Sequence, residues 1–251
     1  MTTLLLLLAC QGPPEVAAVS PPPPPEVAPG LPARSGPLAN TDQLVLVLTP
    51  SWEAVEGTLS RYEHDGSRWQ QVGTESAIVV GLKGLGWGRG LIDAPEGAPT
   101  KAEGDKRAPA GAFRLPSAFG YASTAPEGGL PYTHATASLR CVDDRNSSFY
   151  NQIVDSAEVQ VDWKSAETMR RKDELYEWGV VVDHNGDAVP GAGSCIFLHV
   201  GRPGKGTVGC TAMNADELKE VMAWLDPAEH PVMVQVPSPV YEAHRQEWGL
   251  P

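Results

Sequence analysis

Short apolar or alternating stretches recur along most of the chain, a pattern that indicates β-strands rather than long helices. Residues 44–48 and 77–82 are each predicted to form a strand, and residues 57–73 a hairpin centred on Asp65-Gly66. Residues 178–183 and 194–200 are predicted to form adjacent buried strands, and residues 232–236 a final strand. Glycine and proline recur too often before residue 150 for a helix of useful length.

Two segments carry helix signals. Asn214 can accept a hydrogen bond from the backbone N–H of Glu217, whose side chain can reach back, as in a capping box. Apolar residues at helical spacing follow before Pro227, namely Leu218, Val221, Met222 and Leu225. A short helix is also predicted between 159 and 175, opening near Ser165. The fold class expected is therefore mainly β, a sandwich or barrel with a few peripheral helices.

The first ten residues are unlike the rest of the chain. An apolar run from Leu4 to Leu8 is much shorter than the roughly 20 residues that span a bilayer. It leads into Leu7-Leu8-Ala9-Cys10, which resembles the lipobox of a bacterial lipoprotein signal peptide. Residues 1–10 are therefore predicted to be a lipoprotein signal with lipidation at Cys10, although Met1-Thr2-Thr3 carries no positive charge. The alternative is an ordinary buried apolar segment.

Residues 11–40 are rich in proline, alanine and valine, with five consecutive prolines from Pro21 to Pro25. Such a stretch favours polyproline II and predicts a semi-rigid tether, a proline-rich ligand being the alternative. The folded domain is predicted over 41–251. Behind a lipid anchor, it would lie in the cell envelope, on the periplasmic side, as an outer-membrane lipoprotein.

Charge and cysteine content narrow the function further. A formal net charge of -12 and a pI of about 4.9 argue against nucleic-acid binding and against an anionic membrane surface as partner. If Cys10 carries lipid, three cysteines remain in an oxidising compartment. A Cys141–Cys195 disulfide would leave Cys210 free. Alternatively, Cys195 is only a small buried hydrophobic residue.

The strongest chemical signal is the turn from Thr207 to Cys210, which follows a strand ending at His199. A thiol becomes nucleophilic when a base or positive charge lies nearby, and an imidazole on a rigid strand is a suitable base. Gly209 permits a tight turn in which backbone N–H groups of Gly209 and Cys210 form an oxyanion hole. The positive end of the helix predicted just after the turn would favour the thiolate.

Other chemistries fit the chain less well. A zinc site of His199 and Cys210 with His184 or Cys195 lacks the usual chelate spacing. A Ser-His-Asp hydrolase lacks its G-x-S-x-G elbow, and no phosphate-binding loop is present. No metal and no cofactor are therefore expected.

The combination of His199 with Thr207-x-Gly-Cys210 resembles the active-site signature of the L,D-transpeptidase catalytic domain family (YkuD-like), cysteine enzymes that remodel peptidoglycan. Further segments between 77 and 236 are similar to members of that family: Lys101-Ala-Glu-Gly-Asp105 with Pro109, Gly111 and Phe113; Cys141-Val-Asp-Asp144; Tyr150-Asn151; and Trp178 to Asn185.

The resemblance implies a β-rich fold whose cysteine lies in a cleft, with Cys210 as nucleophile and His199 as general base. The carbonyl of Val200 or Gly201 would orient the histidine, and Thr207 would shape the turn. Substrate-cleft candidates are Lys101, His184 and Asn185. Ala212 stands where many members have arginine, and the segment between His199 and Cys210 is short; both departures bear on acceptor choice.

The function implied is transfer of a peptidoglycan stem peptide, through a Cys210 thioester with release of D-alanine, to an amine acceptor. The same thioester chemistry would serve an L,D-carboxypeptidase, or an amidase that releases a wall-bound envelope protein. A catalytically silent peptidoglycan-binding lipoprotein and a zinc-stabilised structural domain are alternatives from other classes.

Overall fold

A computed structural model describes residues 36, 38–126, 129–202 and 204–251. Cys10, the predicted signal segment and most of the predicted tether lie outside these residues. Leu38 is buried in the hydrophobic core, so the folded part begins just before the predicted boundary at 41. Among the described residues, no helix is both long enough and apolar enough to cross a membrane.

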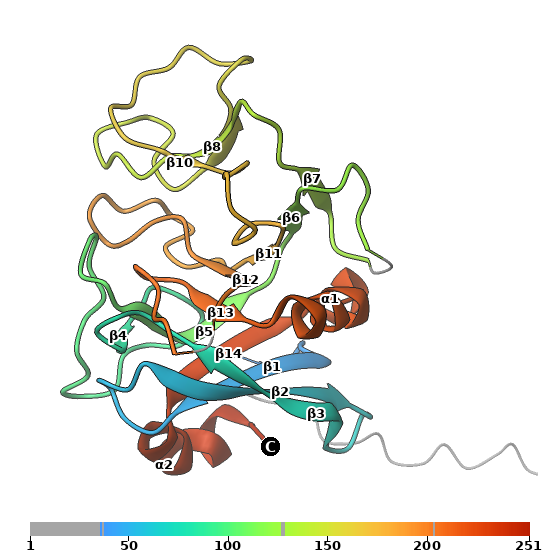
Figure 1. Ribbon diagram of the computed structural model, residues 1–251. Helices are drawn as coiled ribbons and strands as arrows, with labels where there is room; N and C mark the ends of the chain where they lie inside the picture. The colour runs from blue at the N-terminus through green and yellow to red at the C-terminus, as the bar shows by residue number, and fades with distance from the viewer. Residues whose placement is uncertain (1–35, 37, 127–128, 203) are drawn as a thin grey trace, which may run out of the picture. The chain divides into compact units, whose positions relative to one another are not determined.

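Most strands join one large mixed sheet, in the order β4-β5-β14-β1-β2-β3-β13-β12-β11-β6-β7 (Figure 1). Along the chain its strands are β1 (Gln43–Thr49), β2 (Glu56–His64), β3 (Trp69–Val79), β4 (Leu85–Trp87), β5 (Ala108–Arg114), β6 (Ala118–Gly120), β7 (Tyr132–His134), β11 (Trp178–Val181), β12 (Phe197–Val200), β13 (Thr211–Met213) and β14 (Val232–Pro237). The parallel pair β1–β14 joins segments far apart in sequence, while the parallel pair β12–β13 joins two strands linked by the 201–210 segment. These pairings place the cysteine turn beside the strand of His199.

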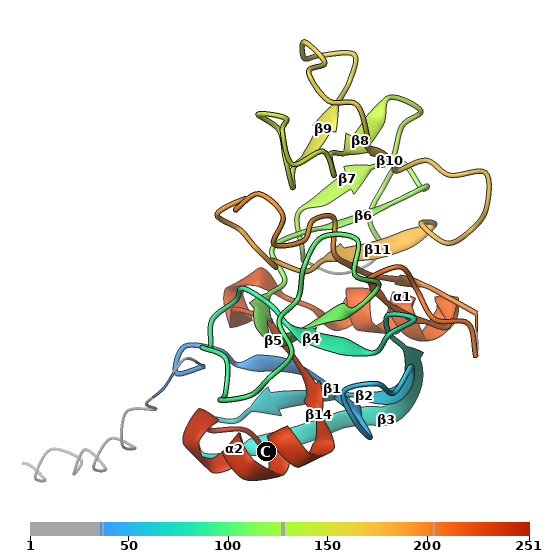
Figure 2. The same ribbon diagram turned by 90° about the vertical axis from the view of Figure 1, so that its left-hand side faces the viewer.

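A second sheet has three short strands, in the order β10-β8-β9. Its strands are β8 (Leu139–Cys141), β9 (Ile153–Asp155) and β10 (Glu167–Thr168). Figures 1 and 2 both show it beyond β6, β7 and β11, at the opposite end from β1, β2 and β3. A disulfide between Cys141 and Cys195, with sulfurs 2.07 Å apart, ties this sheet to the segment preceding β12.

Two α-helices flank the large sheet. The helix α1 (Ala215–Trp224) packs on β11 and β12, while α2 (Ser238–Trp248) packs on β14 and β1. Asn214 caps α1, because its side chain accepts hydrogen bonds from the backbone N–H groups of Asp216 and Glu217. A single 3₁₀ turn, η1 (Pro227–Glu229), separates α1 from β14.

Two hydrophobic clusters fill the interior, and β12 contributes to both. Leu198 and Val200 belong to the larger cluster, which also contains the buried face of α1. Phe197 belongs to the smaller cluster, together with Tyr176 and Cys210. Because side chains alternate along a strand, His199 faces the same side as Phe197. The smaller cluster is therefore the side of the sheet on which the chemistry-bearing residues gather.

The mainly β class, the hairpin around Asp65, the helix after Asn214 and the adjacent strands near 180 and 198 are confirmed. The helix predicted between 159 and 175 is wrong, since Glu167 pairs with Cys141 in a β-ladder and Met169 is buried in the smaller cluster. The stretch 77–82 is not a separate strand either; its first residues end the long strand β3. The helix α2 was not predicted.

Candidate active site

Cys210 and His199 line one pocket of about 620 Å³ on the smaller-cluster side of the sheet. Its walls come from the 101–104 loop, the segments 167–176 and 194–201, and the turn that ends at Cys210. The parallel ladder pairs Leu198 with Thr211 and His199 with Ala212. Cys210 directly precedes this ladder, so its side chain falls on the same face as those of Ala212 and His199. The ladder thus brings the two residues into one pocket.

The turn before Cys210 is held by Thr207. Its hydroxyl donates to the carbonyl of Cys210 (2.6 Å) and accepts from the N–H of Gly209 (3.1 Å). The N–H of Gly209 is therefore already engaged, which does not fit the predicted oxyanion hole at that group. Val208, between Thr207 and Gly209, is 72% exposed at the rim of the pocket.

His199 is buried, and its ring is oriented by a backbone carbonyl. Its Nδ1 lies 2.7 Å from the carbonyl oxygen of Val200. A carbonyl only accepts hydrogen bonds, so Nδ1 carries the hydrogen and, in the neutral ring, Nε2 holds the lone pair. Burial lowers the pKa of His199 to about 4. The carbonyls of Val200 and Leu175 act in the opposite direction, because they favour the charged ring. At neutral pH the ring is uncharged and can accept a proton.

Cys210 is a free cysteine and is buried, with a relative exposure of 7%. Its Sγ donates to the carbonyl of Cys195 (3.5 Å) instead of to His199. Burial raises the pKa of Cys210 to about 12, and the charge of Glu167 acts in the same direction. The resting pair is therefore a neutral thiol and a neutral imidazole.

The helix α1 does not favour the thiolate as predicted. The three residues of β13 and the cap residue Asn214 separate Cys210 from Ala215, where α1 begins. At about 3.3 Å per strand residue β13 alone spans roughly 10 Å, beyond the range over which a helix terminus acts. The N–H groups at that terminus are also capped by Asn214.

Four carboxylates line the same pocket, and two of them, Glu167 and Asp143, are called the acidic wall below. Glu167 accepts a hydrogen bond from the hydroxyl of Tyr176, whose ring stacks edge-on against His199 with centroids 5.2 Å apart. Burial raises the pKa of Glu167, and the charge of Asp143 adds to the effect. Arg171 lies over the Tyr176 ring, 5.1 Å from its centroid.

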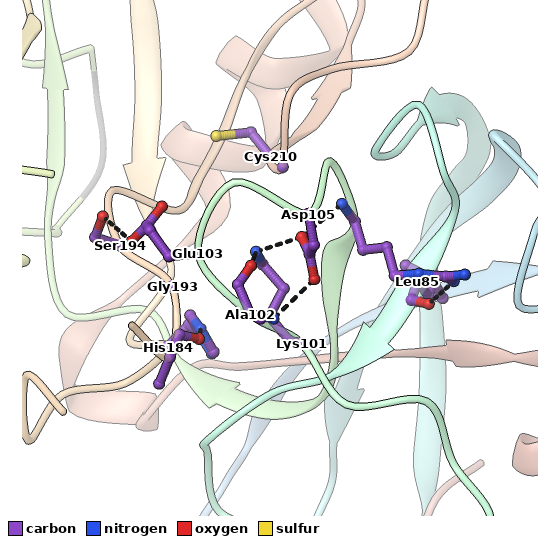
Figure 3. A network of polar contacts seen from close by, with 12 residues as sticks. Leu85, Lys101, Ala102, Glu103, Asp105, His184, Gly193, Ser194 and Cys210 are labelled. Carbon is purple, nitrogen blue, oxygen red and sulfur yellow. Dashed lines mark hydrogen bonds and ion pairs between the residues drawn. The ribbon is translucent and has the colours of Figure 1, made fainter. Parts of the chain in front are cut away.

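Lys101 lines the pocket as well, but its ammonium group is engaged within its own loop. It donates to Asp105 (2.8 Å) and to the carbonyl of Ala102 (2.6 Å), and Asp105 also accepts from the Ala102 N–H (Figure 3). Glu103, from the same loop, accepts from Ser194 (2.7 Å). The loop is therefore fastened to the segment before Cys195, as Figure 3 shows.

His184 and Asn185 do not line this pocket. The His184 Nδ1 accepts from the N–H of Arg89 (3.2 Å), and Nε2 bonds the carbonyl of Ala192 (3.0 Å). Asn185 donates to the carbonyls of Val189 and Gly193, both at 3.0 Å. Both side chains organise the 184–193 loop instead of a shared cleft with Cys210.

The zinc alternative does not fit the geometry, because Cys195 is bonded to Cys141 and His184 is held by backbone groups elsewhere. Within the described part of the chain, no three residues of the metal-ligating types cluster in a way that could hold a metal ion.

Three site residues carry no site signal in the sequence, namely Tyr176, Arg171 and Glu167, whereas Asp143 lies in the Cys141-Val-Asp-Asp144 segment that resembles the family. The residues around Glu167 instead indicate the first turn of a helix. Only the long-range pairing of Glu167 with Cys141 brings that carboxylate to the pocket.

Comparison with known proteins adds no relative: no family model, no curated protein and no solved structure matches the chain. Fold and site together define a mainly β protein with a buried free thiol and an uncharged histidine in one pocket.

Proposed function

We propose that this protein is a cysteine-dependent L,D-transpeptidase of the cell envelope, with the fold of that family. The observation that carries the proposal is the shared pocket of Cys210 and His199, in which the Val200 carbonyl fixes the histidine tautomer. This leaves the Nε2 lone pair available to a thiol, which is what a general base requires. The motif resemblance supplies the substrate class, peptidoglycan stem peptides.

In the proposed acylation, Sγ of Cys210 attacks the carbonyl of the third stem-peptide residue while its proton goes to Nε2 of His199. The C–N bond then breaks, and the imidazolium returns the proton to the departing D-alanine. The carbonyls of Val200 and Leu175 stabilise the transient imidazolium, since both favour the charged ring. No cofactor takes part.

The geometry at rest adds one requirement. The Cys210 thiol donates to Cys195, so its side chain must turn from that carbonyl before His199 takes the proton. Substrate binding is the natural trigger, because catalytic hydrogen bonds often form only in the substrate complex.

Hydrolysis of the same thioester would make the protein an L,D-carboxypeptidase, and a protein-linked donor would make it an amidase. A catalytically silent peptidoglycan-binding lipoprotein is favoured by one observation, the deep burial of a thiol whose pKa is raised to about 12.

The test is incubation of the purified chain with disaccharide-tetrapeptides, beside a Cys210→Ala variant, followed by intact-mass measurement. An acyl adduct on the wild type with release of alanine is expected, and none on the variant. Cross-linked products would indicate transpeptidation, and free tripeptides would indicate hydrolysis. An unmodified wild-type protein that still binds peptidoglycan would favour the silent lipoprotein.

Localisation is a separate proposal. We infer lipidation at Cys10 from the lipobox-like sequence, and expect Cys10→Ser to move the protein from the membrane fraction to the soluble fraction. Unchanged partitioning would contradict it.

A further inference from the structure

The acidic wall faces the Cys210 pocket without direct ionic partners. Within the described residues, neither Glu167 nor Asp143 forms a salt bridge. Four cationic side chains line the same pocket: Lys101, Arg171, Arg202 and Lys205. Arg171 binds Asp173 through two hydrogen bonds of 2.8 and 2.9 Å, and Lys101 binds Asp105. None of the four forms a salt bridge with Glu167 or Asp143 in the described part of the chain, so a bound cationic group could pair with these two carboxylates.

A second observation points to a hydrogen-bond donor at the same place. The Oδ1 atom of Asp143 is buried and has no hydrogen-bond partner among the described residues. Leaving a buried acceptor unsatisfied costs about 1–3 kcal/mol, and more for a charged group. An N–H group of a bound molecule would satisfy it.

Glu167 is also placed to influence the sulfur. Its charge is the second cause, after burial, of the raised pKa of Cys210. A cation bound to Glu167 would offset that charge and make Sγ a better leaving group.

We propose that Glu167, positioned by Tyr176 and flanked by Asp143, binds the ammonium group of the acceptor and takes its proton before attack on the Cys210 thioester. This assignment rests on the proposed function, and it makes Glu167 the base of the second half-reaction, as His199 is of the first.

The ammonium gives one proton to the Glu167 carboxylate, which later releases it to solvent. The neutral nitrogen forms a C–N bond with the thioester carbon, the C–S bond breaks, and the electron pair leaves on Sγ. The second proton of the nitrogen passes through His199 to Sγ, which restores the thiol.

The surroundings of Glu167 make its carboxylate more basic than an exposed one. Burial raises its pKa, and the charges of Asp143 and Glu103 raise it further, while the Tyr176 hydroxyl and Arg171 oppose them. A carboxylate of raised pKa is a stronger proton acceptor than one in water.

The test separates the two half-reactions in the full-length chain. Glu167→Gln keeps the size and the hydrogen bond to Tyr176 but removes the base. Adduct formation on Cys210 with a tetrapeptide donor is measured first, and decay of the adduct is then followed with two amines at pH 7. Ethanolamine is largely protonated and needs a base, whereas hydroxylamine is already neutral.

Adduct formation in Glu167→Gln is expected within a few-fold of the wild type, with decay by ethanolamine slowed by about 10²-fold or more and decay by hydroxylamine unchanged. Glu103→Gln is the matched control, because it removes a pocket carboxylate held by Tyr150 and Ser194. Its charge is the weakest of the influences on the pKa of Glu167, so this variant should slow neither decay by more than a few-fold. Tyr176→Phe keeps Glu167 but removes its hydrogen-bond donor, and should selectively slow decay by ethanolamine, by a smaller factor.

Equal slowing with both amines, or no slowing with either, would overturn the assignment of Glu167 while leaving the thioester mechanism in place. A wild-type chain that never forms an adduct would overturn the proposed function and this inference together. If Glu167→Gln does not fold, the amine selectivity of Tyr176→Phe decides the question by the same criterion.

Discussion

His184 and His199 are both buried, and burial lowers the pKa of each to about 4, yet their surroundings differ. Both nitrogens of His184 are engaged by backbone groups, Nδ1 by the Arg89 N–H and Nε2 by the Ala192 carbonyl. For His199, no donor among the described residues reaches the lone pair of Nε2. A low pKa therefore does not distinguish the two, whereas an unengaged lone pair does.

The backbone around the two rings makes the same distinction. A Cβ added at Gly88 would lie 2.7 Å from Nδ1 of His184, and one at Gly193 would lie 2.8 Å from Nε2. His184 is thus enclosed by backbone on both sides, while His199 borders a pocket of about 620 Å³. We assign a structural role to the first and propose a chemical role for the second.

The largest expected difference comes from substituting each histidine by glutamine. His199→Gln should slow thioester formation by about 10²- to 10⁴-fold, because the general base is lost. His184→Gln should instead lower the free energy of unfolding by about 1–3 kcal/mol, because buried hydrogen bonds are broken, and leave the rate per folded molecule within a few-fold. Adduct formation and denaturant unfolding measure the two effects.

Equal loss of activity in both variants at full folding would contradict this distinction. Loss of stability without loss of rate in His199→Gln would place His199 with His184 as a structural residue.

Removing the Cys141–Cys195 disulfide is expected to have the next largest effect. The bond closes a loop with a sequence separation of 54, for which loss of chain entropy predicts about 4 kcal/mol of stabilisation. The double variant Cys141→Ala with Cys195→Ala should unfold at correspondingly lower denaturant concentration. An unfolding midpoint equal to that of the oxidised wild type would show that the loop is held by its packing alone.

Acid should destabilise the fold through both histidines. Each has a folded-state pKa of about 4, below the ordinary value of 6.5, so the unfolded state binds more protons between these values. Stability is therefore full above pH 6.5 and falls as the pH drops toward 4, by on the order of 3 kcal/mol per histidine at about 1.4 kcal/mol per pKa unit.

The measurement is the free energy of unfolding from pH 7 to 4 for the wild type and the two glutamine variants. Each variant should remove about half of the pH dependence that the two histidines give to the free energy of unfolding. A slope that is unchanged in His184→Gln would mean that this ring is protonated without cost in the folded state.

The sequence was sufficient to predict those structural features that depend only on neighbouring residues. Asp65-Gly66 specified a hairpin turn, and Asn214 specified a helix start, because each depends on neighbouring residues alone. The motif at Cys210 and the strand ending at His199 also led to residues that share a pocket.

Contacts between distant segments were not predictable in this way. The sequence around Ser165 has the composition of a helix start, but pairing of Glu167 with Cys141 places it in a sheet. The start of α1 is likewise too far from Cys210 to favour its thiolate, because β13 intervenes. The apolar residues that anchor α2, Tyr241 and Trp248, are too widely spaced to give a clear helical pattern.

The smallest expected effect concerns the glycine of the cysteine turn. A Cβ at Gly209 would lie no closer than 3.4 Å to its neighbours, and its φ is not in the left-handed region, so Gly209→Ala should change stability by less than about 0.5 kcal/mol. Gly88→Ala is the matched contrast, because its Cβ would press on His184 and Pro109, each 2.7 Å away, and should cost about 1–3 kcal/mol. Thermal unfolding measures both changes.

If Gly209→Ala keeps its stability but forms the thioester slowly, the glycine serves the approach of substrate to Cys210, and not the fold. Equal destabilisation by both substitutions would show that the backbone on the His199 side is packed as tightly as that around His184, which would remove the contrast between the two histidines.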